Sequence, residues 1–262
     1  MTSIIITSNG PITHVQLNRP EVKNAFNEEL IKDLTDAFGQ LAQNDSCRVV
    51  VLSGAGGFFC AGGDLKWMKS FAHASDAENE ADARRLAGML EAVDQFPKPV
   101  VGQVAGGAFG GGVGLVSVCD VVMAAEGTLF SLSEVKLGLI PAVISPYVIA
   151  KTGVAPARRY FLTGERFDAG MAQRIGLVHE VTKQETLEER TLAIAREFLS
   201  SGPEAVRACK ALIRKVRGEI SPAIQTMTSK EIARLRASPE GQEGMRAFLE
   251  KRRPFWLPDG KS

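Results

Sequence analysis

The chain has 262 residues, a formal net charge of +1 and a hydrophobic content of 45%. This length can bury the core of one α/β domain with an appended helical segment. The near-zero charge excludes the basic footprint that is typical of proteins that bind nucleic acid or an anionic membrane. Four cysteines without a CxxC pair predict reduced thiols and a cytoplasmic location: Cys47, Cys60, Cys119 and Cys209.

The sequence predicts no secretory leader, no membrane span and no metal site. The first ten residues lack a basic segment followed by an apolar one. The longest uncharged stretch, residues 99–119, is too rich in glycine to read as a membrane helix. The three histidines are isolated from each other and from carboxylates at ligand spacing: His14, His73 and His179.

The first half of the chain predicts strands that alternate with helices. Residues 3–8 and 12–18 form two strands joined by Asn9-Gly10, a strong hairpin signal. An amphipathic helix follows from Asn27, and residues 49–53 (VVVLS) form a buried strand before a glycine-rich loop. The apolar stripe of the helix contains Leu30, Ile31, Leu34, Ala37, Phe38 and Leu41.

The rest of the chain predicts more strands, then helices alone. Residues 76–95 are helical in pattern, with Leu86, Leu90 and Val93 at core spacing, and residues 100–104 and 120–124 are strands. This alternation favours α/β layers with right-handed crossovers. After Leu187 the pattern is helical over residues 187–200, 203–217, 222–237 and 239–251.

The glycine-rich run GGAFGGGVGLVSVCD, residues 106–120, does not match the common glycine motifs. It lacks the spacing of the dinucleotide GxGxxG, the phosphate-binding GxxxxGK[ST] and the nucleophile elbow GxSxG. It does lie between a predicted strand and a predicted helix. A backbone N–H at a helix N-terminus is an unpaired donor, and glycine lets a ligand oxygen approach it closely.

A second glycine turn, GAGGFFCAGGDL at residues 54–65, also leads from a strand into a helical pattern. Taken singly, either run is explained as well by a tight turn with close helix packing. Two donors from two loops that meet on one oxygen form an oxyanion hole, in which each donor typically contributes ~2.7–4 kcal/mol of transition-state stabilisation.

Together, FCAGGDLKWM and AFGGGVGLVSVCD resemble the enoyl-CoA hydratase/isomerase (crotonase) family, as do NRPEVKNAFN, FSLSEVKLGLIP and AFLEKRRPFW. The resemblance runs from Ile12 to Phe255. It implies an α/β crotonase-like spiral of ββα repeats with a C-terminal helical trimerisation region. The implied division is a core with the active site at residues 1–195 and a helical segment for oligomerisation and coenzyme A closure at 196–262. The implied assembly is a homotrimer or a dimer of trimers.

The resemblance also implies the site residues. The N–H groups of Gly63 and Gly111 would hold the thioester oxygen of an acyl-CoA. Coenzyme A, which is part of the substrate and not a separate cofactor, would contact Lys23, Ala25, Ala61, Gly63, Asp64, Leu65, Phe248 and Lys251. Lys23 and Lys251 are candidate phosphate partners, although plain solvated charge explains these two lysines equally well.

Hydratases of this family generally use two glutamates, and only one is present. Glu134 matches the second, and its apolar neighbours are expected to raise its pKa. Gly114 stands at the position of the first. This pattern matches a Δ3,Δ2-enoyl-CoA isomerase with a single glutamate. The longer segments GGGVGLVSVCDVVMA and FSLSEVKLGLIPAVISPYV resemble the bacterial methylglutaconyl-CoA hydratase branch of leucine and isoprenoid acid breakdown. We favour that hydratase.

In such a hydratase the distal carboxylate of the substrate could assist the water and would need a cation. Arg84 and Arg85 lie on the helix predicted at 76–95, which in the family borders the acyl pocket. A solvated helix face accounts for either arginine taken singly. An acyl-CoA-binding or RNA-associated protein without catalytic activity is the other alternative. The neutral charge and the presence of both glycines and Glu134 argue against it.

Overall fold

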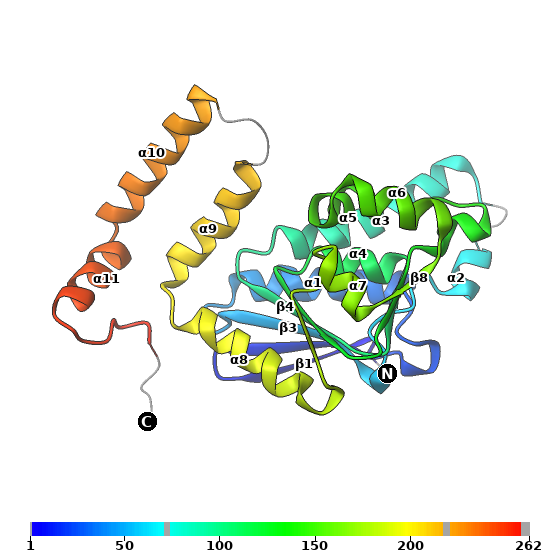
Figure 1. Ribbon diagram of the computed structural model, residues 1–262, viewed down its shortest axis with the longest axis horizontal. Coiled ribbons are helices and arrows are strands. Elements are labelled where there is room, and N and C mark those ends of the chain that lie inside the picture. Colours follow the sequence, from blue (N-terminus) through cyan, green and yellow to red (C-terminus); the bar gives the residue numbers. More distant parts are fainter. Residues whose placement is uncertain (1, 71–73, 217–220, 258–262) are drawn as a thin grey trace.

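The computed structural model describes residues 2–70, 74–216 and 221–257, except the side chains at positions 65, 70 and 222. Figure 1 shows two parts: a core of sheets and helices, and a group of C-terminal helices that projects to the left. No helix in the described ranges is long and apolar enough to cross a membrane.

The main sheet has six strands in the order β1-β2-β3-β4-β6-β9. β1 and β2 are an antiparallel hairpin, as predicted, and Gly10 has the positive φ (58°) that its tight turn requires. The other neighbouring pairs are parallel. The strands are β1 (Ile4–Asn9), β2 (Ile12–Leu17), β3 (Val49–Gly54), β4 (Val100–Val104), β6 (Val121–Ala125) and β9 (Glu180–Thr182).

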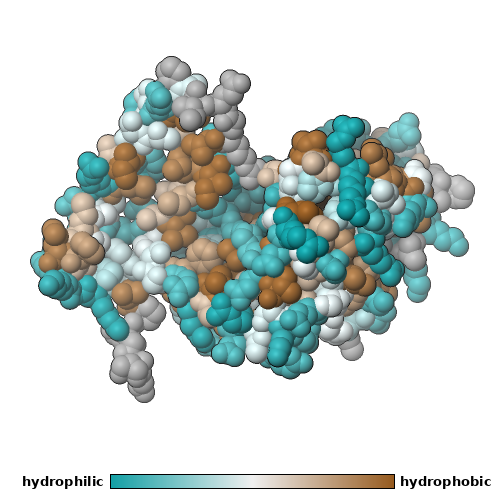
Figure 2. All heavy atoms as spheres, in the orientation of Figure 1, coloured by the Kyte–Doolittle hydropathy of each residue, from teal (hydrophilic) through white to brown (hydrophobic). Residues whose placement is uncertain are grey.

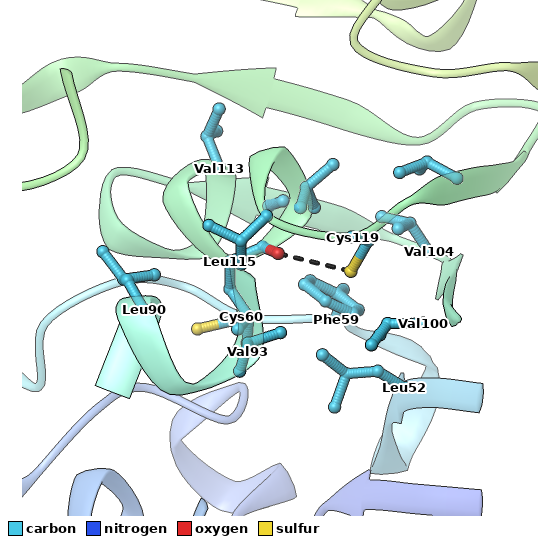
Figure 3. Packing of buried hydrophobic residues seen from close by; sticks show 14 of the residues in the cluster. Leu52, Phe59, Cys60, Leu90, Val93, Val100, Val104, Val113, Leu115 and Cys119 are labelled. Atoms are coloured by element: carbon cyan, nitrogen blue, oxygen red, sulfur yellow. Dashed lines mark hydrogen bonds between the residues drawn. The ribbon is translucent and has the colours of Figure 1, made fainter. Parts of the chain in front are cut away.

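Helices cover both faces of this sheet, which explains the continuous apolar run of β3. Val50 and Leu52 face the larger core with α1 (Glu28–Gln43), α3 (Asp76–Asp94) and α4 (Gly111–Ser117). Val49 and Val51 face a second core under α8 (Leu187–Leu199). Figure 3 shows the larger core beside α4, where the Cys119 thiol donates to the carbonyl of Leu115 at 3.3 Å.

A second, smaller sheet carries the residues that lie beside the site. It contains β5 (Gly107–Phe109), β7 (Leu129–Ser131) and β8 (Arg166–Asp168), and Cys60 extends it by a bridge to Ala108. β5 lies inside the glycine-rich run, where no strand was predicted. A three-residue strand of Gly-Ala-Phe has too little apolar alternation to be recognised in the sequence.

The predicted helices are confirmed, with ends shifted by a few residues. All six residues of the predicted stripe on α1 are buried, and the Asn27 side chain caps this helix by accepting from the N–H of Leu30. The remaining helices are α2 (Leu65–Ser70), α5 (Ser145–Thr152), α6 (Val154–Thr163), α7 (Ala169–Arg174), α9 (Pro203–Lys215), α10 (Pro222–Ala237) and α11 (Pro239–Leu249).

The C-terminal helices α9–α11 are joined to the core by polar contacts. Lys210 on α9 lies 2.6 Å from Asp120, and Arg48 donates to the carbonyl of Ser201. Figure 2 shows apolar residues gathered on this part. The predicted division at residue 196 falls inside α8, which packs on the sheet, and the division into two units stays a prediction. The exposed apolar side chains are Ile213, Val216, Ile232, Met245, Phe248, Leu249 and Phe255.

Candidate active site

The two glycine loops predicted from the sequence meet directly. The Phe109 N–H donates to the Cys60 carbonyl at 2.9 Å. Gly62 has a φ of 88°, and a Cβ on it would lie 2.7 Å from the Phe109 oxygen and 3.4 Å from the Gly111 nitrogen. Only glycine combines this backbone conformation with this close approach. The residues just before Gly63 therefore lie against the start of α4.

Gly63 is held by the backbone bonds of its two neighbours. The Phe26 N–H donates to the Gly62 carbonyl at 2.7 Å, and the Asp64 N–H donates to the Phe26 carbonyl at 2.8 Å. In this parallel bridge, the backbone groups of Gly63 point away from Phe26. Within the described residues, the Gly63 N–H has no acceptor.

Gly111 is the first residue of α4, so its N–H has no partner within the helix. No acceptor for it is present among the residues that the structure describes. A Cβ on Gly111 would lie 2.8 Å from the Phe26 ring. The same Phe26, which is fully buried, therefore pairs with Gly63 through its backbone and supports Gly111 through its ring.

Glu134 lies beside these donors on the 3-10 turn η3 (Ser133–Leu137). A Cβ on Gly110 would be 3.1 Å from Oε1 of Glu134. Oε2 is buried and has no hydrogen-bond partner in the described part of the chain. Burial raises the pKa of this carboxyl, and the hydrogen bond from its own backbone N–H only partly offsets the effect. A carboxyl with these properties is suited to proton transfer.

The position of the first family glutamate is closed. Gly114 is buried in α4, and a Cβ on it would lie 2.2 Å from Cγ2 of Ile144 and 3.8 Å from Leu90. Ile144 and Leu90 are themselves buried. A larger side chain at position 114 would therefore require Ile144 to move.

Several residues predicted to contact coenzyme A lie together beside Gly63. The Ala61 N–H donates to the Lys23 carbonyl at 2.9 Å, and Ala25 is buried next to them. Lys23 is exposed, with its Nζ 5.3 Å from the centroid of the Phe58 ring. Leu65 begins α2, but its side chain lies outside the described part of the structure.

The Asp64 carboxylate faces the protein interior, and the contact of Asp64 with coenzyme A stays a prediction. Asp64 is 7% exposed, and its oxygens accept hydrogen bonds from Arg19 and from the Lys66 N–H. Burial raises the pKa of Asp64, but these hydrogen bonds outweigh it, so the pKa falls below its ordinary value. The carboxylate therefore stabilises the loop that carries Gly63, and only the backbone of Asp64 is available to a ligand.

Phe248 and Lys251 are not part of this arrangement within one chain. Phe248 is 83% exposed on α11, and Lys251 follows that helix. In Figure 1 α11 lies at one end of the long axis, whereas α2, which follows Gly63, lies at the other. The chain cannot close these residues over its own Gly63. Their contribution from a second copy stays a prediction.

The predicted acyl-pocket arginines are paired with acids on the surface. Arg84 forms an ion pair with Glu80, and its side chain is 76% exposed. Arg85 lies 3.0 Å from Asp82 and 4.0 Å from Glu28. No described contact joins either arginine to Glu134 or Gly111. The solvated helix face, the alternative interpretation, describes both positions better.

A cavity of about 730 Å³ lies at the base of the C-terminal helices and not at this site. Its lining includes Arg48, Lys98, Arg207 and Glu240, and none of the predicted site residues. Glu240 accepts hydrogen bonds from the N–H groups at the start of α9, so the carboxylate is used to hold the helices together. This cavity is therefore separate from the candidate active site.

The model of the enoyl-CoA hydratase/isomerase family matches residues 7–258. The chain belongs to this family. The enoyl-CoA hydratase/isomerase fold is also shared with an enoyl-CoA hydratase from Shewanella pealeana, at a TM-score of 0.94 and 40% identity over 97% of this chain and 96% of that one. The crotonase-like α/β fold that the motifs predict is therefore confirmed.

Two enzymes of the family also align with most of this chain. The 2,3-dehydroadipyl-CoA hydratase of Escherichia coli is 33% identical over 256 residues, which are 97% of this chain and 98% of that protein. An enoyl-CoA hydratase of Alternaria alternata is 36% identical over 248 residues, which are 91% of this chain and 78% of that protein.

Three residues of this site were not predicted from the sequence: Phe26, Arg19 and Ile144. Phe26 and Arg19 lie in NRPEVKNAFN, one of the segments that resemble the family, but no contact of either residue was predicted. Ile144 had no signal at all. Its role depends on the approach of a segment 30 residues from Gly114, which only the folded chain shows.

Proposed function

We propose that this protein adds water to 2-enoyl-CoA thioesters through an enolate held by the N–H groups of Gly63 and Gly111. The observation that carries the proposal is the contact between the two loops that hold Gly63 and Gly111, whose N–H groups have no acceptor within the described residues, beside Glu134, whose buried Oε2 has no partner there either. Preorganised donors of this kind stabilise negative charge as it develops on the thioester oxygen.

In this mechanism Glu134 moves one proton. Its carboxylate removes a proton from water while the water oxygen bonds to C3 of the enoyl group. The C2=C3 electron pair shifts toward the thioester, whose oxygen becomes the enolate oxygen at Gly63 and Gly111. Glu134 then returns its proton to C2, which completes the 3-hydroxyacyl-CoA and restores the carboxylate.

The finer proposal is that the substrate is acidic, of the methylglutaconyl-CoA type. Its support is the closed position 114, because a second enzymic carboxylate has no room beside Ile144. A distal carboxylate on the substrate would supply the missing group. Since Arg84 and Arg85 are paired on the surface, the group that receives this carboxylate is not assigned to either.

The same observation favours a second candidate, Δ3,Δ2-enoyl-CoA isomerisation. A single carboxylate can remove a proton from C2 of a 3-enoyl thioester and return it to C4, without water. The two reactions share the oxyanion donors and Glu134 and differ in the substrate that they consume.

A panel of coenzyme A esters tests these proposals. Hydration of crotonyl-CoA or a glutaconyl-type ester removes the ultraviolet band of the conjugated enoyl thioester and adds the mass of one water. We expect the acidic ester to have the higher kcat/KM. A higher value for crotonyl-CoA would contradict the acidic substrate. Appearance of the conjugated band from a 3-enoyl ester, with no gain in mass, would replace hydration by isomerisation.

A further inference from the structure

Arg19 connects the NRP motif to the loop that carries Gly63. Its Nη2 lies 2.9 Å from Oδ2 of Asp64, and its Nη1 donates to the carbonyl of Ala25. The side chains of the ion pair are only 17% and 9% exposed. A guanidinium with two fixed partners holds them in one relative geometry, because its donors form a rigid planar fork.

The backbone beside Arg19 is held in an unusual conformation. Lys23 and Asn24 both have positive φ, 52° and 56°, which is unfavourable for residues with a side chain. Asn24 is fully buried, and its amide donates to the carbonyls of Ala55 and Phe58 at 2.9 and 2.6 Å. Its side-chain oxygen accepts the N–H of Arg19 at 2.8 Å. These contacts bind the motif to the start of the same glycine loop.

The end of the loop is bound on both sides of Gly63. The N–H of Phe26 donates to the Gly62 carbonyl, and the carbonyl of Phe26 accepts from the N–H of Asp64, the residue directly after Gly63. The other oxygen of Asp64 accepts the Lys66 N–H at 2.8 Å, which fixes the start of α2. The Gly63 N–H belongs to the planar peptide between Gly62 and Gly63, whose carbonyl accepts from the Phe26 N–H. The next residue along the chain is Asp64, which is bonded to Arg19. The direction of the Gly63 N–H thus depends on both anchors.

We propose that Arg19 is a positioning residue for the reaction: through Asp64 it fixes the direction of the Gly63 N–H without touching the substrate. This rests on the proposed function, in which that N–H binds the enolate oxygen. The negative charge on the thioester oxygen develops in the transition state, so a small rotation of this donor lowers kcat more than it weakens ground-state binding.

The test compares Arg19→Met and Asp64→Asn with a control variant, Arg159→Met. Arg159 lies on α6, and its exposed ion pair with Glu165 is lost in this control. For the two site variants we expect kcat to fall by roughly 10–100-fold, with KM within about threefold, because misplacement by about 1 Å can cost about 10²-fold. The double variant Arg19→Met/Asp64→Asn should lose less than the product of the two single effects, since both substitutions break the same ion pair and each side chain has one further contact of its own. Arg159→Met should keep the kcat of the unmodified protein.

A spectroscopic readout separates positioning from stability. Acetoacetyl-CoA has an enolate form with its own near-ultraviolet band, and an intact oxyanion hole increases the bound enolate fraction at a fixed pH. We expect the unmodified protein to increase this band and Arg19→Met to lose most of the increase, with unchanged affinity for coenzyme A. Arg19→Lys keeps the charge without the fork and should be intermediate.

The outcomes distinguish the two proposals. If the unmodified protein increases the enolate band but turns over no enoyl ester, the proposed function fails, and the band still measures the effect of Arg19. If Arg19→Met and Asp64→Asn keep kcat and the band while only their melting temperatures fall, Arg19 is structural and the inference is overturned. If the unmodified protein leaves the band unchanged, both proposals fail, because there is no oxyanion hole to position.

Discussion

The carboxyl of Glu134 lies against the backbone of Gly110, so closely that a Cβ on Gly110 would be 3.1 Å from its Oε1. Gly110 has a φ of 50° and directly precedes Gly111, one of the two proposed oxyanion donors. The close contact places the carboxyl of Glu134 against the residue before Gly111, so the proposed proton-transfer group and the proposed charge-stabilising N–H lie near each other in space. A substrate whose thioester oxygen binds the Gly111 N–H therefore has its reacting carbons near Glu134.

Glu134→Gln is expected to lower kcat by about 10²–10⁴-fold, because the amide cannot exchange the proton that a carboxyl supplies. The affinity for the coenzyme A ester should change little, since the peptide donors stay in place. Steady-state kinetics with the best ester of the panel, together with calorimetric titration of coenzyme A, measure both quantities. A variant that retains more than about a tenth of the original kcat would remove Glu134 from the mechanism.

The same substitution should stabilise the folded protein at neutral pH. Burial raises the pKa of Glu134 above its ordinary value of 4.5, so the folded state binds this proton more tightly than the unfolded state. The stability that this group contributes is present below pH 4.5 and is lost as the pH rises through the raised pKa. Glu134→Gln lacks this loss, so its melting temperature should exceed that of the unmodified protein at pH 8, and the difference should shrink toward pH 4.5.

Glu165→Gln is the matched control for this pH dependence. The hydrogen bond from Arg159 lowers the pKa of Glu165, so its contribution to stability has the opposite sign. Glu165→Gln should therefore gain no stability at pH 8. If Glu134→Gln shows no gain either, the folded protein tolerates the charged carboxylate without penalty.

The local signals in the sequence were sufficient to predict the framework. The Asn9-Gly10 turn, the stripe on α1 and the apolar run of β3 each depend on residues close in the chain, and the structure confirms all three. The two glycine turns were recognised for the same reason, since a turn, a close approach and a free N–H are properties of a few consecutive residues. Their pairing needed the family resemblance.

Contacts between distant residues could not be predicted in this way. The family resemblance marked Asp64 as a coenzyme A contact, but its ion pair with Arg19, which lies 45 positions earlier, had no signal in the sequence. Arg84 and Arg85 were candidates because their helix borders the acyl pocket in the family, whereas the structure pairs them with Glu80 and Asp82 on the surface of that helix. Which side of a loop or helix faces the substrate depends on tertiary packing, which composition and spacing do not contain.

The donor role of Gly111 is best tested by two variants that share one new atom. Gly111→Ala adds a Cβ 2.8 Å from the Phe26 ring and keeps the N–H, whereas Gly111→Pro adds the same atom and removes the N–H. Gly111 is the first residue of α4, a position that accepts proline without breaking the helix. We expect kcat of Gly111→Pro to be about 10²–10³-fold below that of Gly111→Ala. Equal kcat values in two folded variants, judged by circular dichroism, would show that this N–H does not act in the reaction.

The contact between Gly114 and Ile144 gives the last prediction, which concerns packing. A Cβ at position 114 would lie 2.2 Å from Cγ2 of Ile144, and both residues are buried, so Gly114→Ala should destabilise the protein by about 1–3 kcal/mol through overpacking. Ile144→Ala removes the nearer obstructing atom and leaves a cavity, at a typical cost of about 2–5 kcal/mol, but it keeps the Cβ of residue 144, which would lie 2.8 Å from the new methyl group. We therefore expect the cost of Gly114→Ala to be smaller in the Ile144→Ala background than in the unmodified protein, but not zero, because the contact at 2.8 Å remains.

Urea unfolding of the unmodified protein, the two single variants and the double variant measures this double-mutant cycle. If the two changes in the free energy of unfolding simply add, Ile144 does not limit position 114.

The same pair of positions allows a test of the chemistry. Gly114→Glu/Ile144→Ala relieves the contact at 2.2 Å and leaves the one at 2.8 Å, so a second carboxylate at position 114 is less obstructed than in Gly114→Glu alone. If hydration is limited by the missing acid, the double variant should hydrate crotonyl-CoA faster than Ile144→Ala does. No gain in a folded double variant would mean that the single-glutamate site already places its water, and that the identity of residue 114 does not decide the reaction.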